Sequence, residues 1–94
     1  MRNTPENNVK RMIKVQLTLA QCFWYPAVAG PYSVSGIPDF VGCHKGRFFG
    51  VEAKAPGKKP TALQLKRKSE IEAAGGKWFL VDGDLTELQE WLCE

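Results

Sequence analysis

Two acidic residues and a lysine are the side chains of this sequence best placed to do chemistry together. Asp39 closes a Gly-Ile-Pro-Asp segment and, after twelve intervening residues, Glu52 opens the triplet Glu-Ala-Lys that ends at Lys54. If the chain between them forms a hairpin that turns at Lys45-Gly46, Asp39 and Glu52 face each other with Cβ atoms about 4.5–5.5 Å apart. Facing carboxylates repel each other, and a divalent cation is their natural partner; hard oxygen ligands favour Mg²⁺ or Mn²⁺. A shift of one residue in this register would place the two acids on opposite faces.

Lys54 follows Glu52 by two residues, so both side chains project from the same face of a strand. The backbone carbonyl of Ala53 lies between them and is a further candidate metal ligand. Two acids, a lysine and a cation on one rigid surface suit hydrolysis of a phosphodiester. The cation binds the phosphate and lowers the pKa of a bound water, while the lysine steers that water or neutralises the phosphate. Taken singly, Glu52 and Lys54 are compatible with ordinary charges on an exposed strand, and only their combination with Pro38-Asp39 is specific.

Two further polar residues lie on expected helices. Glu6 lies in the first turn of a helix that Thr4 caps, at the edge of the helix's apolar stripe. It is either an acid that favours the positive end of the helix dipole or a carboxylate aimed at the site. Gln64 lies three residues into a second helix, between apolar neighbours, and either faces water or hydrogen-bonds a group of the site.

The segments 36–39 and 51–54, together with Gln64, resemble the signature of the PD-(D/E)XK nucleases and, more closely, that of the virus-type replication-repair nuclease (VRR-NUC) family. The similarity covers residues 6–81. It implies that Asp39 and Glu52 are metal ligands for Mg²⁺ or Mn²⁺, that Lys54 is the catalytic lysine, and that Gln64 and Glu6 are the helix-borne polar residues near the site. It also implies a homodimeric endonuclease acting on branched or Holliday-junction DNA. A twofold dimer would supply the two sites needed to cut both strands of a junction.

Six basic residues and no acid lie between residues 54 and 68. They are Lys54, Lys58, Lys59, Lys66, Arg67 and Lys68. Such a run is either a solvated face or an electrostatic footprint for a phosphate backbone, and beside the acid pair we expect the DNA-binding role. An alternative function is a catalytically weak DNA-binding module that uses this segment. A third is an interaction domain whose acids form surface salt bridges.

The pattern of elements predicts an α/β fold with the order α-β-β-β-α-β and a C-terminal helix, a mixed sheet flanked by helices. This is the restriction-endonuclease-like core. The first expected elements are a helix from Pro5 to about Ala20, a short strand or packed turn over 23–26, and strands over 38–43 and 47–54. A helix capped by Thr61 follows and stops at Gly75-Gly76. The chain then forms a strand over 77–81 and a last helix, which Asp84 and Glu87 open as a capping box. The turn between the two hairpin strands is expected at 44–46, which places His44 at the far end from the acids and makes it a poor general base.

Length and composition limit the alternatives. Ninety-four residues predict a single domain over 1–94, and 44% hydrophobic with 24% charged residues exclude disorder as the main state. No apolar run is long enough to span a membrane, and the N-terminus lacks the pattern of a signal peptide. Three cysteines without paired spacing favour a reducing compartment over a disulfide framework or zinc site. We therefore expect a cytoplasmic protein of a bacterium or phage-infected cell, whose net charge of +3 permits a phosphate partner.

Overall fold

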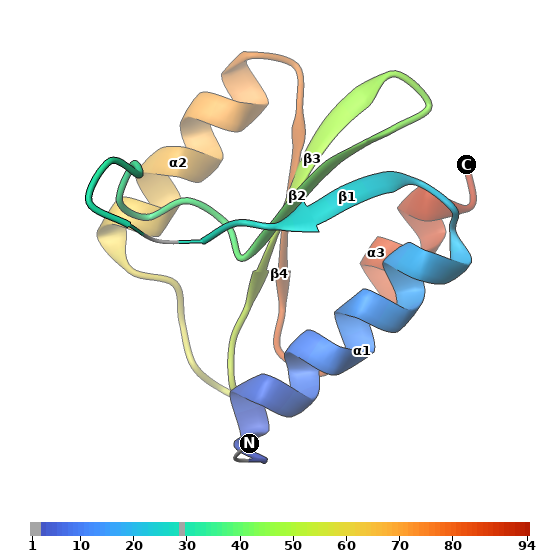
Figure 1. Ribbon diagram of the computed structural model, residues 1–94, viewed down its shortest axis with the longest axis horizontal. Coiled ribbons are helices and arrows are strands. Elements are labelled where there is room, and N and C mark those ends of the chain that lie inside the picture. Colours follow the sequence, from blue (N-terminus) through green and yellow to red (C-terminus); the bar gives the residue numbers. More distant parts are fainter. Residues whose placement is uncertain (1–2, 29) are drawn as a thin grey trace.

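The computed structural model describes residues 3–28 and 30–94 and has an α/β architecture (Figure 1). The elements follow in the order α1 (Pro5–Leu19), β1 (Phe23–Pro26), β2 (Phe40–His44), β3 (Arg47–Ala53), α2 (Ala62–Ala73), β4 (Lys77–Val81) and α3 (Thr86–Leu92). The strands form one sheet in the order β1-β2-β3-β4, antiparallel except for the parallel pair β3 and β4. The predicted fold class, element order and mixed sheet are confirmed.

The β2–β3 hairpin has the predicted register. Phe40 pairs with Val51 and His44 pairs with Arg47, so the chain turns at Lys45-Gly46. Both turn residues have positive φ, 51° and 83°, as a two-residue type I′ turn requires. Asp39 precedes the first of these pairs and Glu52 follows it, so the same register places the two acids opposite each other at the open end of the hairpin.

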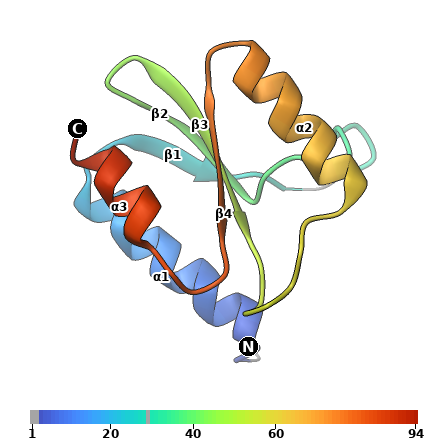
Figure 2. The same cartoon turned by 180° about the vertical axis from the view of Figure 1, so that it is seen from behind.

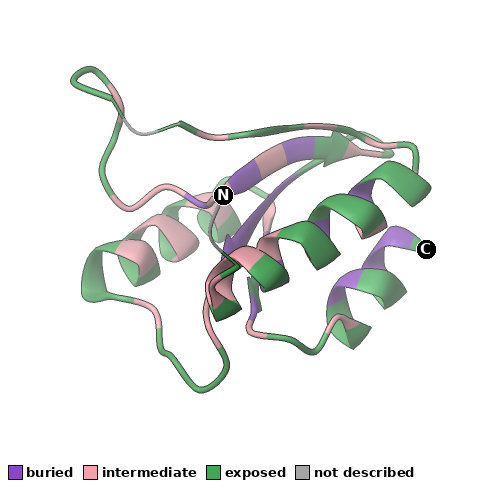
Figure 3. Cartoon of the chain, turned by 60° about the horizontal axis from the view of Figure 1, so that its bottom comes forward, coloured by how far each residue is buried: buried purple, intermediate pink, exposed green. Residues whose placement is uncertain are grey.

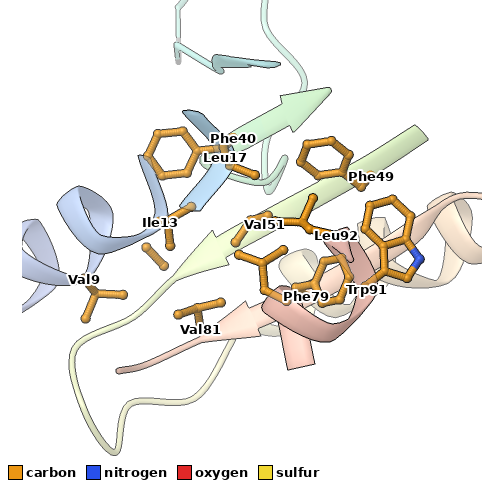
Figure 4. Packing of buried hydrophobic residues seen from close by; sticks show 12 residues of the cluster. Val9, Ile13, Leu17, Phe40, Phe49, Val51, Phe79, Val81, Trp91 and Leu92 are labelled. Atoms are coloured by element: carbon orange, nitrogen blue, oxygen red, sulfur yellow. The ribbon is translucent and has the colours of Figure 1, made fainter. Parts of the chain in front are cut away.

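Helices cover the two faces of the sheet unequally. The helices α1 and α3 lie side by side on one face, and α2 lies on the other, as the two opposite views show (Figures 1 and 2). The face under α1 and α3 holds the apolar core (Figure 4). The core residues are Val9, Ile13, Leu17, Phe40, Phe49, Val51, Ala53, Phe79, Val81, Leu88, Trp91 and Leu92. By contrast, none of the twelve residues of α2 is buried (Figure 3).

Both long helices begin where their caps were predicted. The Thr4 side chain accepts a hydrogen bond from the Asn7 backbone N–H, with Pro5 as the first helical residue. Thr61 and Gln64 form a complete capping box at the start of α2. These caps fix where each helix enters the fold, and so where its polar side chains approach the sheet.

Several predicted boundaries differ in detail from the structure; strand β3, for example, ends at Ala53 and not at Lys54. The last helix begins at Thr86 after an N-cap at Leu85, while Asp84 accepts a hydrogen bond from the Thr86 N–H two residues on instead of capping the helix. Strand β2 begins at Phe40, since Pro38 has no N–H for a ladder, and β2 includes His44. The His44 Nε2 lies 2.9 Å from the Leu92 carbonyl oxygen, and His44 is next to the turn of the hairpin, at the opposite end from the acids.

No helix in the described part of the chain is long and apolar enough to cross a membrane.

Candidate active site

A hydrogen bond from the backbone of β3 holds the Asp39 side chain at the open end of the hairpin. The Asp39 Oδ2 accepts a hydrogen bond from the Ala53 N–H at 2.8 Å. Because the N–H and C=O of one residue in an extended strand point to the same side, the Ala53 carbonyl also faces the Asp39 side. The predicted ligand set of two carboxylates and this carbonyl is therefore gathered at one end of β3.

Two glycines allow the segment before Asp39 to approach closely. A Cβ at Gly50 would lie 2.6 Å from the Pro38 Cγ, so the Pro38 ring packs directly against the β3 backbone. Gly36 has φ +80°, and a Cβ there would lie 2.8 Å from the Leu63 side chain of α2. The Gly-Ile-Pro-Asp segment thus runs between β3 and α2 and delivers Asp39 to the site.

Glu52 is the buried acid of the sheet, with 4% of its surface exposed. Its Oε2 accepts a hydrogen bond from Gln64 Nε2 at 3.1 Å and lies 4.0 Å from Lys54 Nζ. Its Oε1 is buried and has no hydrogen-bond partner among the described residues. Burial, followed by the negative charge of Asp39, raises the pKa of Glu52 to about 8, and the Lys54 charge only partly offsets them. A buried carboxyl oxygen without a hydrogen-bond partner is costly, and a group that contacts Oε1 would offset that cost.

Gln64 links the start of α2 to the buried acid. Its Oε1 accepts from the Thr61 N–H while its Nε2 donates to Glu52. Of the two alternatives that the sequence left open, the structure has Gln64 contacting the site. The helix cap therefore fixes the orientation of the amide that holds Glu52.

Helix α1 brings two charged residues to the other side of Asp39. The Lys10 Nζ lies 3.5 Å from Glu6 Oε2 and 3.9 Å from Asp39 Oδ1. Glu6 faces the site closely enough for its charge to contribute to the raised pKa of Glu52. However, no group of three or more His, Cys, Asp or Glu side chains close enough to hold a metal occurs within residues 3–28 and 30–94. Glu6 is thus an ion-pair partner of Lys10 in this structure and does not complete a three-carboxylate cluster.

Lys10 was not among the predicted site residues. Its place one turn after Glu6, where an i,i+4 ion pair forms, was the available signal. Its proximity to Asp39 depends on how α1 crosses the sheet, which the local sequence does not specify.

A cavity of about 290 Å³, here called the acid cavity, opens over Asp39, Glu52 and Gln64. Its opposite wall is the loop over residues 30–38, where the Ser33 N–H donates to the Gly30 carbonyl oxygen. Both carboxylates therefore line a space that a phosphate group and a cation can enter.

The basic segment divides into two parts. Arg67 donates from Nε to the Ser35 carbonyl oxygen and pairs with Glu70, so it ties the 30–38 loop to α2. Lys68 pairs with Glu72 and lies over the Trp78 ring. The other predicted DNA-binding residues are exposed and make no ion pair in the described structure. They are Lys58, Lys59 and Lys66.

The residues present fit a divalent cation. Asp39, Glu52 and the Ala53 carbonyl offer the hard oxygen donors that Mg²⁺ and Mn²⁺ prefer. A cation between the two acids would contact the unpartnered Glu52 Oε1 and offset the effect of the Asp39 charge, which raises the pKa of Glu52. Both features would be unexplained in an ordinary surface salt-bridge network.

Sequence comparisons identify no family or relative for this chain, so its function is inferred from the geometry of the site and from the sequence. No protein-family profile matches the chain, and no characterised protein matches it in sequence.

Proposed function

We propose that this protein is a metal-dependent DNA endonuclease that uses Mg²⁺ or Mn²⁺. The observation that carries the proposal is the environment of Glu52. This acid is buried opposite Asp39, with one oxygen held by Gln64 beside Lys54 and the other without a partner in the described structure. A packing role does not account for a buried acid left in that state, whereas a cation site does.

Each residue has a distinct part in the proposed reaction. Asp39, Glu52 and the Ala53 carbonyl would hold the cation, which, when bound, supplies Lewis-acid activation of water and charge stabilisation at the phosphate. Lys54 is 15% exposed at its side chain and near Glu52, so its ammonium group can offset negative charge that develops on the reacting phosphate. Gln64 keeps the Glu52 carboxylate oriented and acts as a positioning residue.

The substrate is proposed to be branched DNA, including Holliday junctions, and the active form a homodimer. Support comes from the resemblance of segments 36–39 and 51–54 to the VRR-NUC family and from the exposed lysines Lys58, Lys59 and Lys66 beyond the site. A chain of 94 residues presents a small footprint, so two copies are the simplest way to cut two strands.

The test is cleavage of linear, flap and four-way-junction DNA in Mg²⁺, Mn²⁺ or chelator, with the molecular mass measured in solution. Wild-type protein is expected to cut in either metal and not in chelator. Asp39→Asn and Glu52→Gln should each abolish cutting, while Glu90→Gln, which removes an exposed acid from α3, should cut normally. DNA binding without metal-dependent cutting would overturn the proposal in favour of a DNA-binding module.

A further inference from the structure

A second cavity, of about 200 Å³, adjoins the acid pair on the side of α1. We call it the lysine cavity. It is lined by Lys10, Lys14, Pro26, Ala27, Asp39 and Phe40. It shares Asp39 and Ala27 with the acid cavity, so the two form neighbouring compartments on either side of Asp39.

The two lysines are one helical turn apart on the flank of α1 that faces β2. They belong to the helix whose Val9, Ile13 and Leu17 are buried in the core, so the helix backbone under them is firmly placed. The Lys14 Nζ lies 6.0 Å from the centre of the Phe40 ring and has no carboxylate partner in the described residues. The lysine cavity is therefore lined by two positive charges on a helix that the core holds in place.

The charges that face the lysine cavity determine when it attracts an anion. Glu6 and Asp39 both lie near Lys10 and oppose the binding of a phosphate. Positive charge at the acid pair offsets Asp39, which leaves Lys10 with Glu6 alone. The cavity is then net positive, because Lys14 is unopposed.

We propose that the lysine cavity binds the backbone phosphate next to the scissile one, with Lys10 and Lys14 as its ligands. This inference rests on the proposed function and extends it, because it gives the path of the DNA strand. The strand crosses Asp39 from the α1 side to the Lys54 side. Such contacts position the backbone and carry no sequence preference.

The test measures DNA binding, so it does not depend on cleavage. DNA is bound in Mg²⁺ by the Lys54→Ala protein, in which cutting is expected to be slow, with Lys10→Gln and Lys14→Gln added together. The double change should lower the slope of log affinity against log salt by about one to two units. The Lys10→Arg, Lys14→Arg pair should keep the slope. Melting temperatures show whether the variants remain folded.

A scan of uncharged phosphates identifies the contact. Each phosphate of one strand of the bound DNA is replaced in turn by a methylphosphonate, and binding is compared with that of unmodified DNA. We expect one neutral position to weaken binding by the Lys54→Ala parent several-fold and to have no effect on the protein that also carries Lys10→Gln and Lys14→Gln. A Lys58→Gln, Lys59→Gln pair, with the same change in charge, should retain the sensitivity at that position.

The outcomes separate the two claims. Metal-dependent cleavage by the wild type, together with an unchanged phosphate profile in the Lys10 and Lys14 variant, overturns the lysine cavity and leaves the nuclease proposal standing. Binding without cleavage in which the profile changes as expected supports phosphate binding by Lys10 and Lys14, and it overturns both the nuclease and the placement of that phosphate beside a scissile one. Absence of DNA binding by the wild type overturns both.

Discussion

The two faces of the sheet differ in the kind of side chain that they bury. The face covered by α1 and α3 carries an apolar cluster whose strand members, such as Phe49, Val51 and Phe79, are 0–1% exposed. The face under α2 carries a buried acid and leaves Phe48 and Leu80 at 45% and 37% exposed. Alternate residues of the same strand β3 supply both faces. The apolar core lies on one face, and the buried acid of the proposed site lies on the other, so changes on the two faces should have different effects.

Lys54→Ala should produce the largest effect, confined to the α2 face. We expect the single-turnover cleavage rate to fall about a thousandfold, because a charge placed at the reacting phosphate acts mainly in the transition state. DNA affinity and melting temperature should change little. Lys58→Ala, an exposed lysine outside the site, is the matched control. Equal losses of affinity and rate would make Lys54 a simple backbone contact.

Phe79→Ala should produce the opposite result on the other face. Phe79 is 1% exposed, so we expect the free energy of unfolding to fall by about 3–5 kcal/mol. The milder Ile13→Val should cost about 0.5–1.5 kcal/mol and leave the protein folded. Its cleavage rate well below the melting temperature should match that of the wild type. A rate loss in folded Ile13→Val would show that the faces are not independent.

The raised pKa of Glu52 predicts how stability depends on pH without metal. The folded chain holds this proton up to about pH 8, whereas the unfolded chain loses it near 4.5. Between these values the folded state binds more protons at Glu52, so the contribution of Glu52 to the free energy of unfolding should be fully present below pH 4.5 and be lost as pH rises to 8. Unfolding in denaturant with chelator measures this, and Glu52→Gln should remove that component. If the free energy of unfolding depends on pH in the same way in both proteins, the proton is bound by a group other than Glu52.

The basic segment should show the smallest effects, and they should differ along its length. Replacement of Lys58, Lys59 and Lys66 by glutamine is expected to lower the salt slope of DNA binding by about two to three units. Arg67→Gln should lower it by less than one unit, since Arg67 is engaged with Ser35 and Glu70. If Arg67→Gln has the larger effect, the DNA displaces those contacts.

Local signals explain why much of the fold could be predicted. Turn chemistry at Lys45-Gly46 fixes the hairpin register, and with it the opposition of Asp39 and Glu52. Side-chain caps at Thr4 and Thr61 fix the starts of α1 and α2. These features depend on residues close together in sequence.

What could not be predicted depends on packing between distant segments. Lys10 reaches Asp39 only because α1 crosses the sheet at a particular place. Arg67 anchors a loop more than thirty residues away, at Ser35, so its charge is not simply available to DNA. The failed cap at Asp84 has a local cause, because its side chain accepts from the Thr86 N–H while Leu85 takes the N-cap position.

Titration calorimetry of Mn²⁺ into the protein in the absence of DNA shows whether Asp39 and Glu52 hold a cation. We expect saturable binding by the wild type and by Lys58→Gln, and loss of that binding in both Asp39→Asn and Glu52→Gln, with all four proteins folded. Metal binding by the two acid variants that matches the wild type would contradict the proposed site, as would a folded wild type that binds no Mn²⁺.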